Sequence, residues 1–489
     1  MNVREYFESA KKNKSLLRQF IADMPKGGDL HNHLIGAAYA ETFFEIGCKH
    51  GLFADLNTGK LYKEIPTVVT DSNQLVQLSE TMSNLHSVRM TLIDKWSIRD
   101  FQPYKFPLGP DEYFFSLFGL FIEAAGGEYL PDLVHELRVR AKEENVQYIE
   151  TIGIAPSVSA TADLSNDKFE KYSANIKELC AEYNDDPELT SEKLETLICS
   201  IINDYDAEYN NENSDIYQNV KRYVESNKAM ASADHDMNNT YLTSRFDTIK
   251  ADDNDVLIKF QGYASRDKDP MIVLCQLYII YKAMTIIPDI LVGCNIVAAE
   301  NSEKSMQYYK AHMIMFKVFR RIYNAKTAVH AGELTMGLIP PEHLTYHVTD
   351  AVKISGADRI GHGVDIVFEH NSADLLREMR ERGIAIEINL TSNEFILGVK
   401  GDSHPFMLYK ESGVPIVIST DDPGILRTSL TEEYVLAVYR YDLSYDDVKK
   451  IVKNSITYSF LNDADKKNVM DSYLIKLAEF ERRYETLQG

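Results

Sequence analysis

The chain has 489 residues, of which 44% are hydrophobic and 26% charged, with 24 Gly and 15 Pro. These are ordinary globular proportions, and they exclude collagen-like, low-complexity and wholly disordered chains. Asp and Glu (74) outnumber Lys and Arg (52), which gives a formal net charge of −22. A field of that sign repels nucleic acid and anionic membranes, so we expect neither as a partner and favour a neutral or cationic small molecule.

No targeting or membrane segment is apparent in the sequence. Residues 1–20 are charged throughout and lack the apolar core of a signal peptide. The longest near-apolar run, 271–281, is too short to span a membrane. The five cysteines are scattered and include no Cys-x-x-Cys pair, which disfavours disulfides and a thiolate zinc site. We therefore expect free thiols and a cytoplasmic protein.

Eight short apolar runs, most of them ending in polar residues, follow one another along the chain and predict eight strands. The markers His330, His362, Thr391 and Asp421 near the ends of the last four runs are spaced 32, 29 and 30 residues apart. Amphipathic stretches such as 372–383 lie between the runs and predict helices. The predicted strands are 27–36, 145–153, 256–264, 289–300, 327–333, 359–365, 385–393 and 415–423.

Strands that alternate with helices at this spacing predict a parallel α/β architecture, and eight such units predict a (β/α)8 TIM barrel. A barrel of this kind needs about 250 residues. The remaining residues fall mainly into two large, mainly helical insertions, 37–144 after strand 1 and 154–255 after strand 2. The second insertion is acidic and predicts a surface subdomain. We interpret 1–489 as a single barrel domain with further helices after residue 424.

Function in such a barrel lies at the carboxyl ends of the strands, and titratable side chains gather there. Nitrogen and oxygen ligands without sulfur suit Zn²⁺ in a catalytic site. Taken singly, a His-x-His pair or an Asp-Asp-Pro turn is more often structural, but their joint placement predicts a mononuclear metal hydrolase. The side chains concerned are His31, His33, His330, Glu333, His362, Asp421 and Asp422.

The same segments carry a resemblance to a known family. MPKGGDLHNHLIGA, VHAGEL, RIGHGVD, LTSN and ISTDDPG, in this order, resemble the motifs of the adenosine deaminase family of metal-dependent amidohydrolases. The likeness extends over about 24–40 and 290–462, is weak over 40–144 and is absent from 155–255. The long polar insertion is similar to that of larger bacterial members and of secreted growth-factor-type deaminases.

The resemblance implies hydrolytic deamination of adenosine, or of a related 6-aminopurine nucleoside, to inosine and ammonia. Glu333 would carry a proton to purine N1, which aids attack because C6 is a poor electrophile. His362 would position the attacking hydroxide and stabilise charge near the metal, and Asp422 would accept a hydrogen bond at purine N7. One Zn²⁺ per chain would be held by His31, His33, His330 and Asp421.

Two positions depart from the family pattern. Where the family has a strand-4 glycine whose N–H meets purine N3, this chain has Ala298. A backbone donor survives this change unless the added Cβ crowds the base. Where compact members place an Asp that contacts the ribose 5′-hydroxyl, this chain has Ile35. We therefore expect weak dependence on the 5′-hydroxyl.

Four alternatives are compared with this interpretation. An AMP or 5′-methylthioadenosine deaminase would share the site, but AMP requires Arg or Lys near the pocket and no basic cluster follows any strand. A binuclear amidohydrolase usually needs a strand-4 lysine, which 289–300 lacks. Cysteine-ligated zinc deaminases are excluded because there is no Pro-Cys-x-x-Cys. A non-catalytic, growth-factor-like binding protein is disfavoured because every expected ligand and acid is present.

Overall fold

The computed structural model describes residues 2–67, 74–106, 108–183, 186–232 and 256–486. Eight parallel strands in two four-stranded sheets form its centre. The first sheet has the order β1 (Gly28–His33), β5 (Tyr148–Ile152), β6 (Leu257–Ser265), β7 (Leu291–Val297). The second has the order β11 (Ile416–Ile418), β10 (Ala385–Ile388), β9 (Arg359–His362), β8 (Ala328–Ala331). Seven of the eight strands lie within the predicted runs, and β6 extends one residue beyond the run 256–264.

The two sheets meet at both of their outer edges. A single parallel bridge joins Asn32 on β1 to Asp421, three residues beyond β11. A second parallel bridge joins Cys294 on β7 to Thr327, next to β8. The side chain of Asn32 also donates to the Thr420 hydroxyl at 3.0 Å. We call the contact between β1 and the residues that follow β11 the β1–β11 seam.

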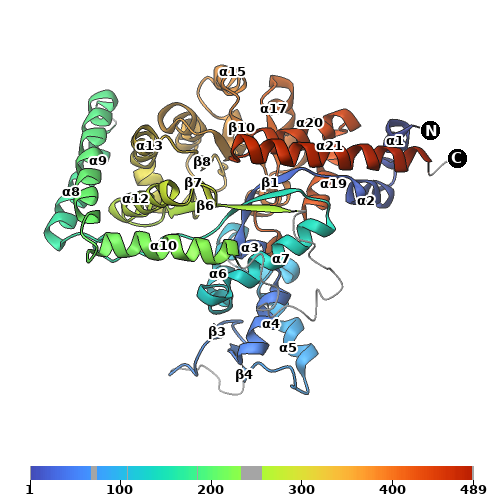
Figure 1. Ribbon diagram of the computed structural model, residues 1–489, viewed down its shortest axis with the longest axis horizontal. Coiled ribbons are helices and arrows are strands. Elements are labelled where there is room, and N and C mark those ends of the chain that lie inside the picture. The colour runs from blue at the N-terminus through green and yellow to red at the C-terminus, as the bar shows by residue number, and fades with distance from the viewer. Residues whose placement is uncertain (1, 68–73, 107, 184–185, 233–255, 487–489) are drawn as a thin grey trace.

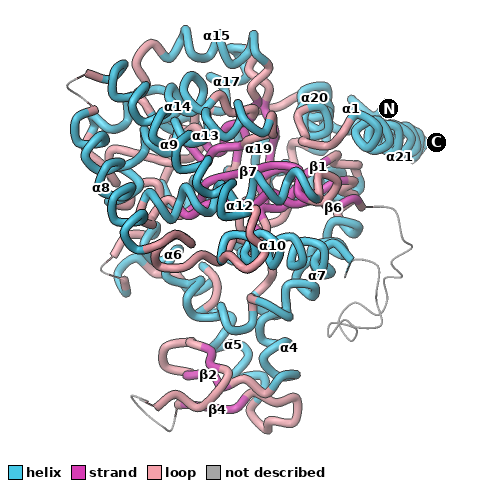
Figure 2. The backbone as a smooth tube through the Cα atoms, turned by 60° about the vertical axis from the view of Figure 1, so that its left-hand side comes forward, coloured by secondary structure: helices cyan, strands magenta, loops and turns pink. Residues whose placement is uncertain are grey.

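Helices surround the strands, as Figure 2 shows. α12 (Pro270–Ile286) buries 13 of its 17 residues, so the apolar run 271–281 belongs to a helix in the protein interior. α15 (Ser372–Arg382) buries Leu375, Leu376 and Met379 and ends at Gly383, whose φ of 66° suits glycine. The other helices of this layer are α13 (Glu303–Tyr323), α14 (His347–Asp350), α16 (Leu390–Leu397), α17 (Phe406–Ser412), α18 (Pro423–Leu426), α19 (Leu430–Tyr441) and α20 (Tyr445–Thr457).

Part of the chain between β1 and β5 forms a projection at the bottom of Figure 1. It contains a small antiparallel sheet of β2 (Phe53–Asp55), β3 (Leu61–Tyr62) and β4 (Leu75–Gln77). These strands were missing from our expectation of a mainly helical segment, because two or three residues are too few to show an alternating pattern. The helices here are α3 (Leu34–Ala37), α4 (Ala40–His50), α5 (Leu85–Lys95), α6 (Pro110–Phe121) and α7 (Leu130–Glu143).

Three long helices follow β5, in agreement with the predicted helical character of this segment. They are α8 (Asn166–Glu182), α9 (Pro187–Tyr209) and α10 (Asp215–Ser232). The rest of the predicted insertion, 233–255, lies outside the described residues.

The two ends of the chain lie side by side (Figure 1). The ring of Phe20, on α2 (Lys14–Asp23), packs against Phe480 and Tyr484 of α21 (Asp463–Thr486) with centroids 4.9 Å apart in both pairs. α1 (Val3–Ala10) precedes α2 and adds Phe7 to this aromatic cluster. The first helices therefore cover the same side of the molecule as the last.

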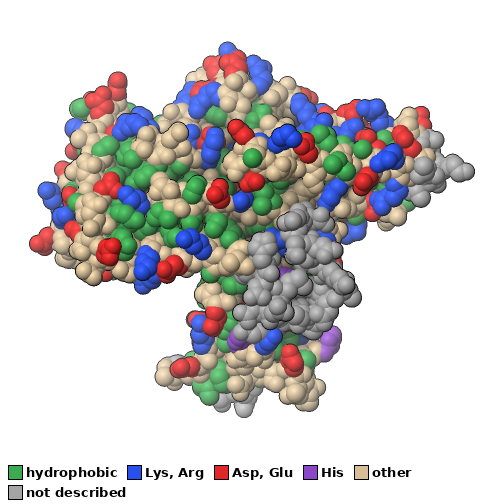
Figure 3. Space-filling view, viewed as in Figure 1, with side chains coloured by type: hydrophobic (Ala, Val, Ile, Leu, Met, Phe, Trp, Pro, Cys, Tyr) green, Lys and Arg blue, Asp and Glu red, His purple; other side chains and the backbone are tan. Residues whose placement is uncertain are grey.

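The surface is charged and mixed. On the face drawn in Figure 3, Lys and Arg side chains are interspersed with Asp and Glu. No helix among the described residues combines the length and the apolar character needed to cross a membrane. The five cysteines are free thiols, and Cys275 and Cys294 are buried.

Candidate active site

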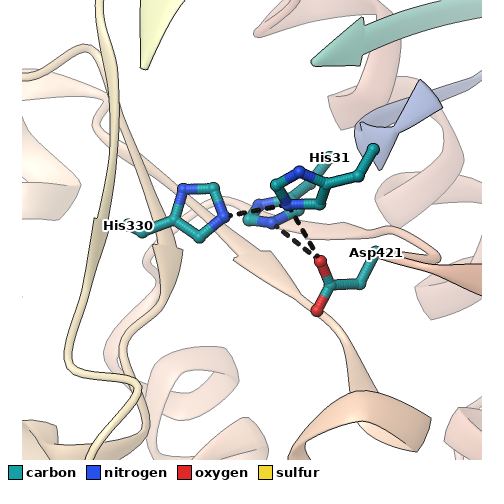
Figure 4. A group of neighbouring side chains, drawn as sticks. His31, His330 and Asp421 are labelled. Atoms are coloured by element: carbon teal, nitrogen blue, oxygen red, sulfur yellow. Dashed lines mark hydrogen bonds and ion pairs between the residues drawn. The ribbon is translucent and has the colours of Figure 1, made fainter. Parts of the chain in front are cut away.

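Three imidazoles and one carboxylate converge where β1 and β8 end and the chain leaves β11. Their nearest nitrogen and oxygen atoms all lie within 4.8 Å of one another. Asp421 Oδ1 is 3.4 Å from His31 Nε2 and 3.2 Å from His33 Nε2. His33 Nε2 lies 3.1 Å from His330 Nε2. Figure 4 shows His31, His330 and Asp421 pointing toward one another. The structure thus brings together all four predicted metal ligands.

The β1–β11 seam holds two of these side chains in place. The backbone N–H of Asp421 donates to the carbonyl of His31, and the N–H of His33 donates to the carbonyl of Asp421, both at 2.8 Å. Asp421 has a φ of 61°, a left-handed conformation that non-glycine residues adopt only at some cost. This turn directs the carboxylate back toward the histidines instead of along the strand.

Two buried polar side chains orient the histidines. His31 Nδ1 lies 2.7 Å from Glu387 Oε2, and His330 Nδ1 lies 2.8 Å from Asn295 Oδ1. Because the carboxylate and amide oxygens only accept, each imidazole carries hydrogen on Nδ1 and presents Nε2 to the cluster. Sequence reasoning missed both partners. The available signal was a polar residue inside an otherwise apolar strand, Glu387 in AIEI and Asn295 in GCNIV.

The donor set fits a zinc ion. His31 Nε2 is buried and faces three other donor atoms, and its 3.4 Å contact with Asp421 Oδ1 falls short of a well-formed hydrogen bond. A buried nitrogen without a partner is costly unless something binds there. Three imidazole nitrogens and one carboxylate oxygen, without sulfur, are a ligand set that Zn²⁺ accepts. The second-layer hydrogen bonds to Glu387 and Asn295 are typical of such sites.

The pKa values of the four clustered side chains are shifted in different directions. Burial alone would raise the pKa of Asp421, but hydrogen bonds and charge from His31 and His33 hold it well below the usual range. Burial opposes protonation of His31, whereas Asp421 and Glu387 raise its pKa to about 10. Burial and the neighbouring histidines lower the pKa of His330 well below its ordinary value. A metal ion at Nε2 of His31 would compete with the proton there.

Glu333 lies beside the cluster at the end of β8. Burial, and then the negative charges of Asp421 and Glu300, raise its pKa well above that of an ordinary glutamic acid. Its carboxyl therefore favours the protonated form. Glu300 positions this segment because its carboxylate accepts the backbone N–H groups of Gly332 and Glu333 at 3.1 and 2.9 Å. Sequence reasoning also missed Glu300, the last residue of NIVAAE.

His362 stands at the end of β9, between Glu333 and Asp421. Its Nδ1 is 3.7 Å from Glu333 Oε1, and its Nε2 is 3.9 Å from Asp421 Oδ2. Burial lowers the pKa of His362 to about 3, so the imidazole is neutral. The residue has a φ of 68°, which marks a second strained turn at this end of the strands.

A cavity of about 460 Å³ is lined by His33, His330, Glu333, His362 and Asp421. Asp422 lies in its wall, and its buried Oδ1 has no hydrogen-bond partner among the described residues. Burial and the charge of Asp421 raise the pKa of Asp422 well above the usual range. That Asp422 contacts purine N7 stays a prediction; because N7 bears no hydrogen, the protonated carboxyl that burial favours would donate in such a contact instead of accepting.

The two departures from the family pattern also line the cavity. Ala298 has a φ of 78°, a backbone conformation that glycine adopts most easily. The chain therefore has an alanine in the conformation that suits the family's glycine. Ile35, two residues after His33, lies on α3 and also lines the cavity. Phe114, Phe115 and Phe118 of α6 complete an apolar wall that sequence reasoning did not predict.

Comparison with known proteins agrees with the motifs. Residues 273–476 match the family model described as adenosine deaminase. An adenosine deaminase from Clostridium kluyveri is 28% identical over 185 residues, which is 37% of this chain and 50% of that protein. An adenine deaminase from Rhizobium rhizogenes is 34% identical over 138 residues, 28% of this chain and 39% of that protein. The chain spans about half the length, or less, of the curated relatives it matches. The resemblance to adenosine deaminases is confirmed.

Solved structures show a similar fold over nearly the whole chain. An amidohydrolase from Burkholderia ambifaria with bound Zn has a TM-score of 0.54 and 18% identity, over 96% of this chain and 94% of that one. The N6-methyl-AMP deaminase from Arabidopsis thaliana has a TM-score of 0.54 and 15% identity, over 93% of this chain and 98% of that one. The predicted α/β class with parallel strands is therefore confirmed.

Proposed function

We propose that this chain catalyses the zinc-dependent hydrolytic deamination of adenosine, or of a related 6-aminopurine nucleoside, to inosine and ammonia. The observation that carries the proposal is the position of the metal-ligand cluster beside two carboxyl groups that favour the protonated form, in one cavity. A hydrolytic deaminase needs an activated water, an acid for the ring and a means of orienting the base. Each has a matching group here.

One Zn²⁺ per chain would be held by His31, His33, His330 and Asp421. When bound, it would lower the pKa of water toward 7 and so supply hydroxide at neutral pH. The ligands come from strand ends that the seam and buried partners already hold in place. Little reorganisation would accompany binding.

Glu333 supplies the proton that makes the ring reactive. Its protonated carboxyl donates to N1 as oxygen adds at C6, which relieves the aromatic ring of the negative charge. A proton then passes to the exocyclic amine, the C6–N6 bond breaks with its electron pair on nitrogen, and ammonia leaves. The C6 carbonyl of inosine forms at the same time, so adenosine and water are consumed one for one. Asp422 donates to N7 and the backbone N–H of Ala298 donates to N3, which orient the base.

The other end of the cavity fits a nucleoside better than a nucleotide. No Lys or Arg is among the described residues that line it, and Asp267 is there instead. A phosphate would lie against a carboxylate and the apolar wall of Ile35 and α6 without a cation to compensate its charge. We infer that Ile35 meets the 5′ side of the ribose.

We also infer that the chain is a single closed (β/α)8 barrel, with the insertions 37–144 and 154–255 on its surface. The two bridges between the sheets support closure, since each joins the edge strand of one sheet to the neighbouring edge of the other.

The test is the loss of adenosine's ultraviolet absorbance together with the metal content of the purified chain. Adenosine, 5′-methylthioadenosine, AMP and adenine are compared at equal concentration. We expect turnover of the nucleosides, about one zinc per chain, and loss of both metal and turnover in His330→Ala. Fast turnover of AMP would favour a nucleotide deaminase. Full metal content without turnover of any of the four would favour the non-catalytic binding protein, and an active, metal-replete His330→Ala would refute the ligand assignment.

A further inference from the structure

The two ring nitrogens of His362 face different surroundings. Nε2 points toward the metal-ligand cluster, 3.9 Å from Asp421 Oδ2, whereas Nδ1 faces the amide of Asn393 on α16 at 3.0 Å. A neutral imidazole carries one hydrogen, on one nitrogen or the other. Its location decides whether His362 offers a donor or an acceptor to the reacting groups. The structure fixes this location through a chain of hydrogen bonds that begins at α17.

The chain of hydrogen bonds starts at a backbone N–H. The N–H of Phe406 donates to His404 Nδ1 at 3.1 Å, so this nitrogen must be an acceptor. The single hydrogen of the His404 ring is then on Nε2, which lies 3.1 Å from Asn393 Oδ1. Burial lowers the pKa of His404 to about 4, which keeps the ring neutral. His404 is only 3% exposed, so water does not compete for its ring nitrogens.

The amide of Asn393 transmits this orientation. Its oxygen accepts from His404, so its NH₂ group faces His362. The flipped amide would set two donors against each other at His404. An NH₂ group only donates, so His362 Nδ1 must accept. A second amide, that of Asn389, lies 3.4 Å from the same nitrogen, and Glu333 Oε1 at 3.7 Å is beyond hydrogen-bond range.

We propose that Asn393 and His404 are positioning residues that hold His362 as the tautomer with hydrogen on Nε2. His362 is then a hydrogen-bond donor toward the attacking oxygen and cannot act as the base that deprotonates it. The catalytic part of this inference rests on the proposed function, but the tautomer does not. Neither residue lines the cavity, so both act through His362.

The tautomer is measured directly on the full-length chain. The protein is labelled with ¹⁵N-histidine, and NMR distinguishes protonated from unprotonated ring nitrogens. The His362 signals are identified by their loss in His362→Gln. We expect hydrogen on Nε2 and a bare Nδ1 in the wild-type chain. Hydrogen on Nδ1 would overturn the proposal whether or not the protein deaminates adenosine.

Three variants test the consequence for catalysis. Asn393→Asp replaces the donor at Nδ1 by an acceptor and draws the hydrogen of His362 there. We expect kcat to fall about 10²-fold or more, because a wrong tautomer of a catalytic histidine has cost about 10⁴-fold elsewhere. His404→Phe keeps a ring but removes the donor, and we expect a fall of at least about tenfold. His404→Gln restores an N–H near the Nε2 position and should regain most of the lost kcat.

KM for adenosine, metal content and melting temperature separate positioning from structural damage. We expect KM and metal content to stay near wild type in all three variants, because no ligand or cavity-lining residue is changed. His343→Phe, at a histidine that does not line the cavity, is the control for replacing a ring. If Asn393→Asp and His404→Phe both keep kcat within threefold of wild type, the proposal is wrong. If either variant fails to fold, the wild-type tautomer still decides.

Discussion

Adding a single methyl group at Gly36 should disturb Asp422 specifically. It lies on α3 directly beneath Asp422, and a Cβ added there would be 1.5 Å from Asp422 Oδ1 and 2.8 Å from Asp422 Cβ. Ordinary contact begins near 3.4 Å, so Gly36→Ala would move the carboxyl oxygen by about 2 Å. The chain is closely packed here, since a Cβ on Gly424 of α18 would be only 1.9 Å from the Ala38 carbonyl oxygen, just after α3.

The size of the effect follows from the hydrogen bond that is lost. Asp422 Oδ1 has no partner among the described residues, and in the proposed function its carboxyl donates to purine N7. Leaving a buried polar atom such as N7 without its partner costs about 1–3 kcal/mol. Losing this contact should therefore lower kcat/KM for adenosine about 5- to 150-fold. Overpacking should also destabilise the fold by about 1–3 kcal/mol.

The assay compares kcat/KM, metal content and thermal unfolding for two Gly→Ala variants. Gly119→Ala is the matched control, because Gly119 is exposed on α6 and an added Cβ meets nothing within 4 Å. We expect Gly119→Ala to keep its activity and to gain up to about 1 kcal/mol of stability. A Gly36→Ala enzyme with full metal content and kcat/KM within threefold of wild type would refute the assignment of Asp422 to the base.

Three further predictions concern other parts of the molecule. Glu333→Gln should keep its zinc and lose about 10²–10⁴-fold in kcat, since general acid catalysis is worth that much; loss of metal instead would make Glu333 a ligand. With Ile35 beside the ribose, 5′-deoxyadenosine should be deaminated within about tenfold of adenosine, a gap of about 1.4 kcal/mol, and a thousandfold loss in kcat/KM would reveal another polar contact. Burial lowers the pKa of His312 on α13 to about 3, and neither of its ring nitrogens has a partner among the described residues. The unfolded chain takes up this proton near pH 6.5, so stability is complete above that pH and falls by about 3 kcal/mol toward pH 4. His312→Phe should flatten this fall in urea titrations, and an unchanged slope would contradict the reasoning.

The strands could be predicted because the apolar residues that identify each one are adjacent in the sequence. Most of the runs are apolar because their strands are buried on both faces, and most end in polar residues where the chain reaches the cavity. The run 289–300, for example, contains β7 at Leu291–Val297. The candidate ligands followed from the same signal, since the carboxyl ends of parallel strands meet at one end of the fold.

Contacts between distant segments could not be predicted in this way. Glu387 and His31 are separated by 356 residues, and nothing in either segment indicates that they pair. Phe114 lines the cavity because α6 packs against α16, a helix far along the chain. The amide of Asn393 looks like an ordinary helix residue until His404 and His362 are placed on either side of it.

The β1–β11 seam also has a consequence for assembly. Its hydrogen bond from Asn32 to Thr420 spans 388 residues, and the proposed ligands lie on both sides of it. During synthesis His31 and His33 emerge long before Asp421. No folding intermediate that forms before Asp421 emerges can hold the ion with all four ligands. The metal would then bind with all four ligands only late in folding and would stabilise the nearly native structure. An ion at a thousand times its Kd would add about 4 kcal/mol to the free energy of unfolding, so chelation should destabilise the folded chain by about that amount.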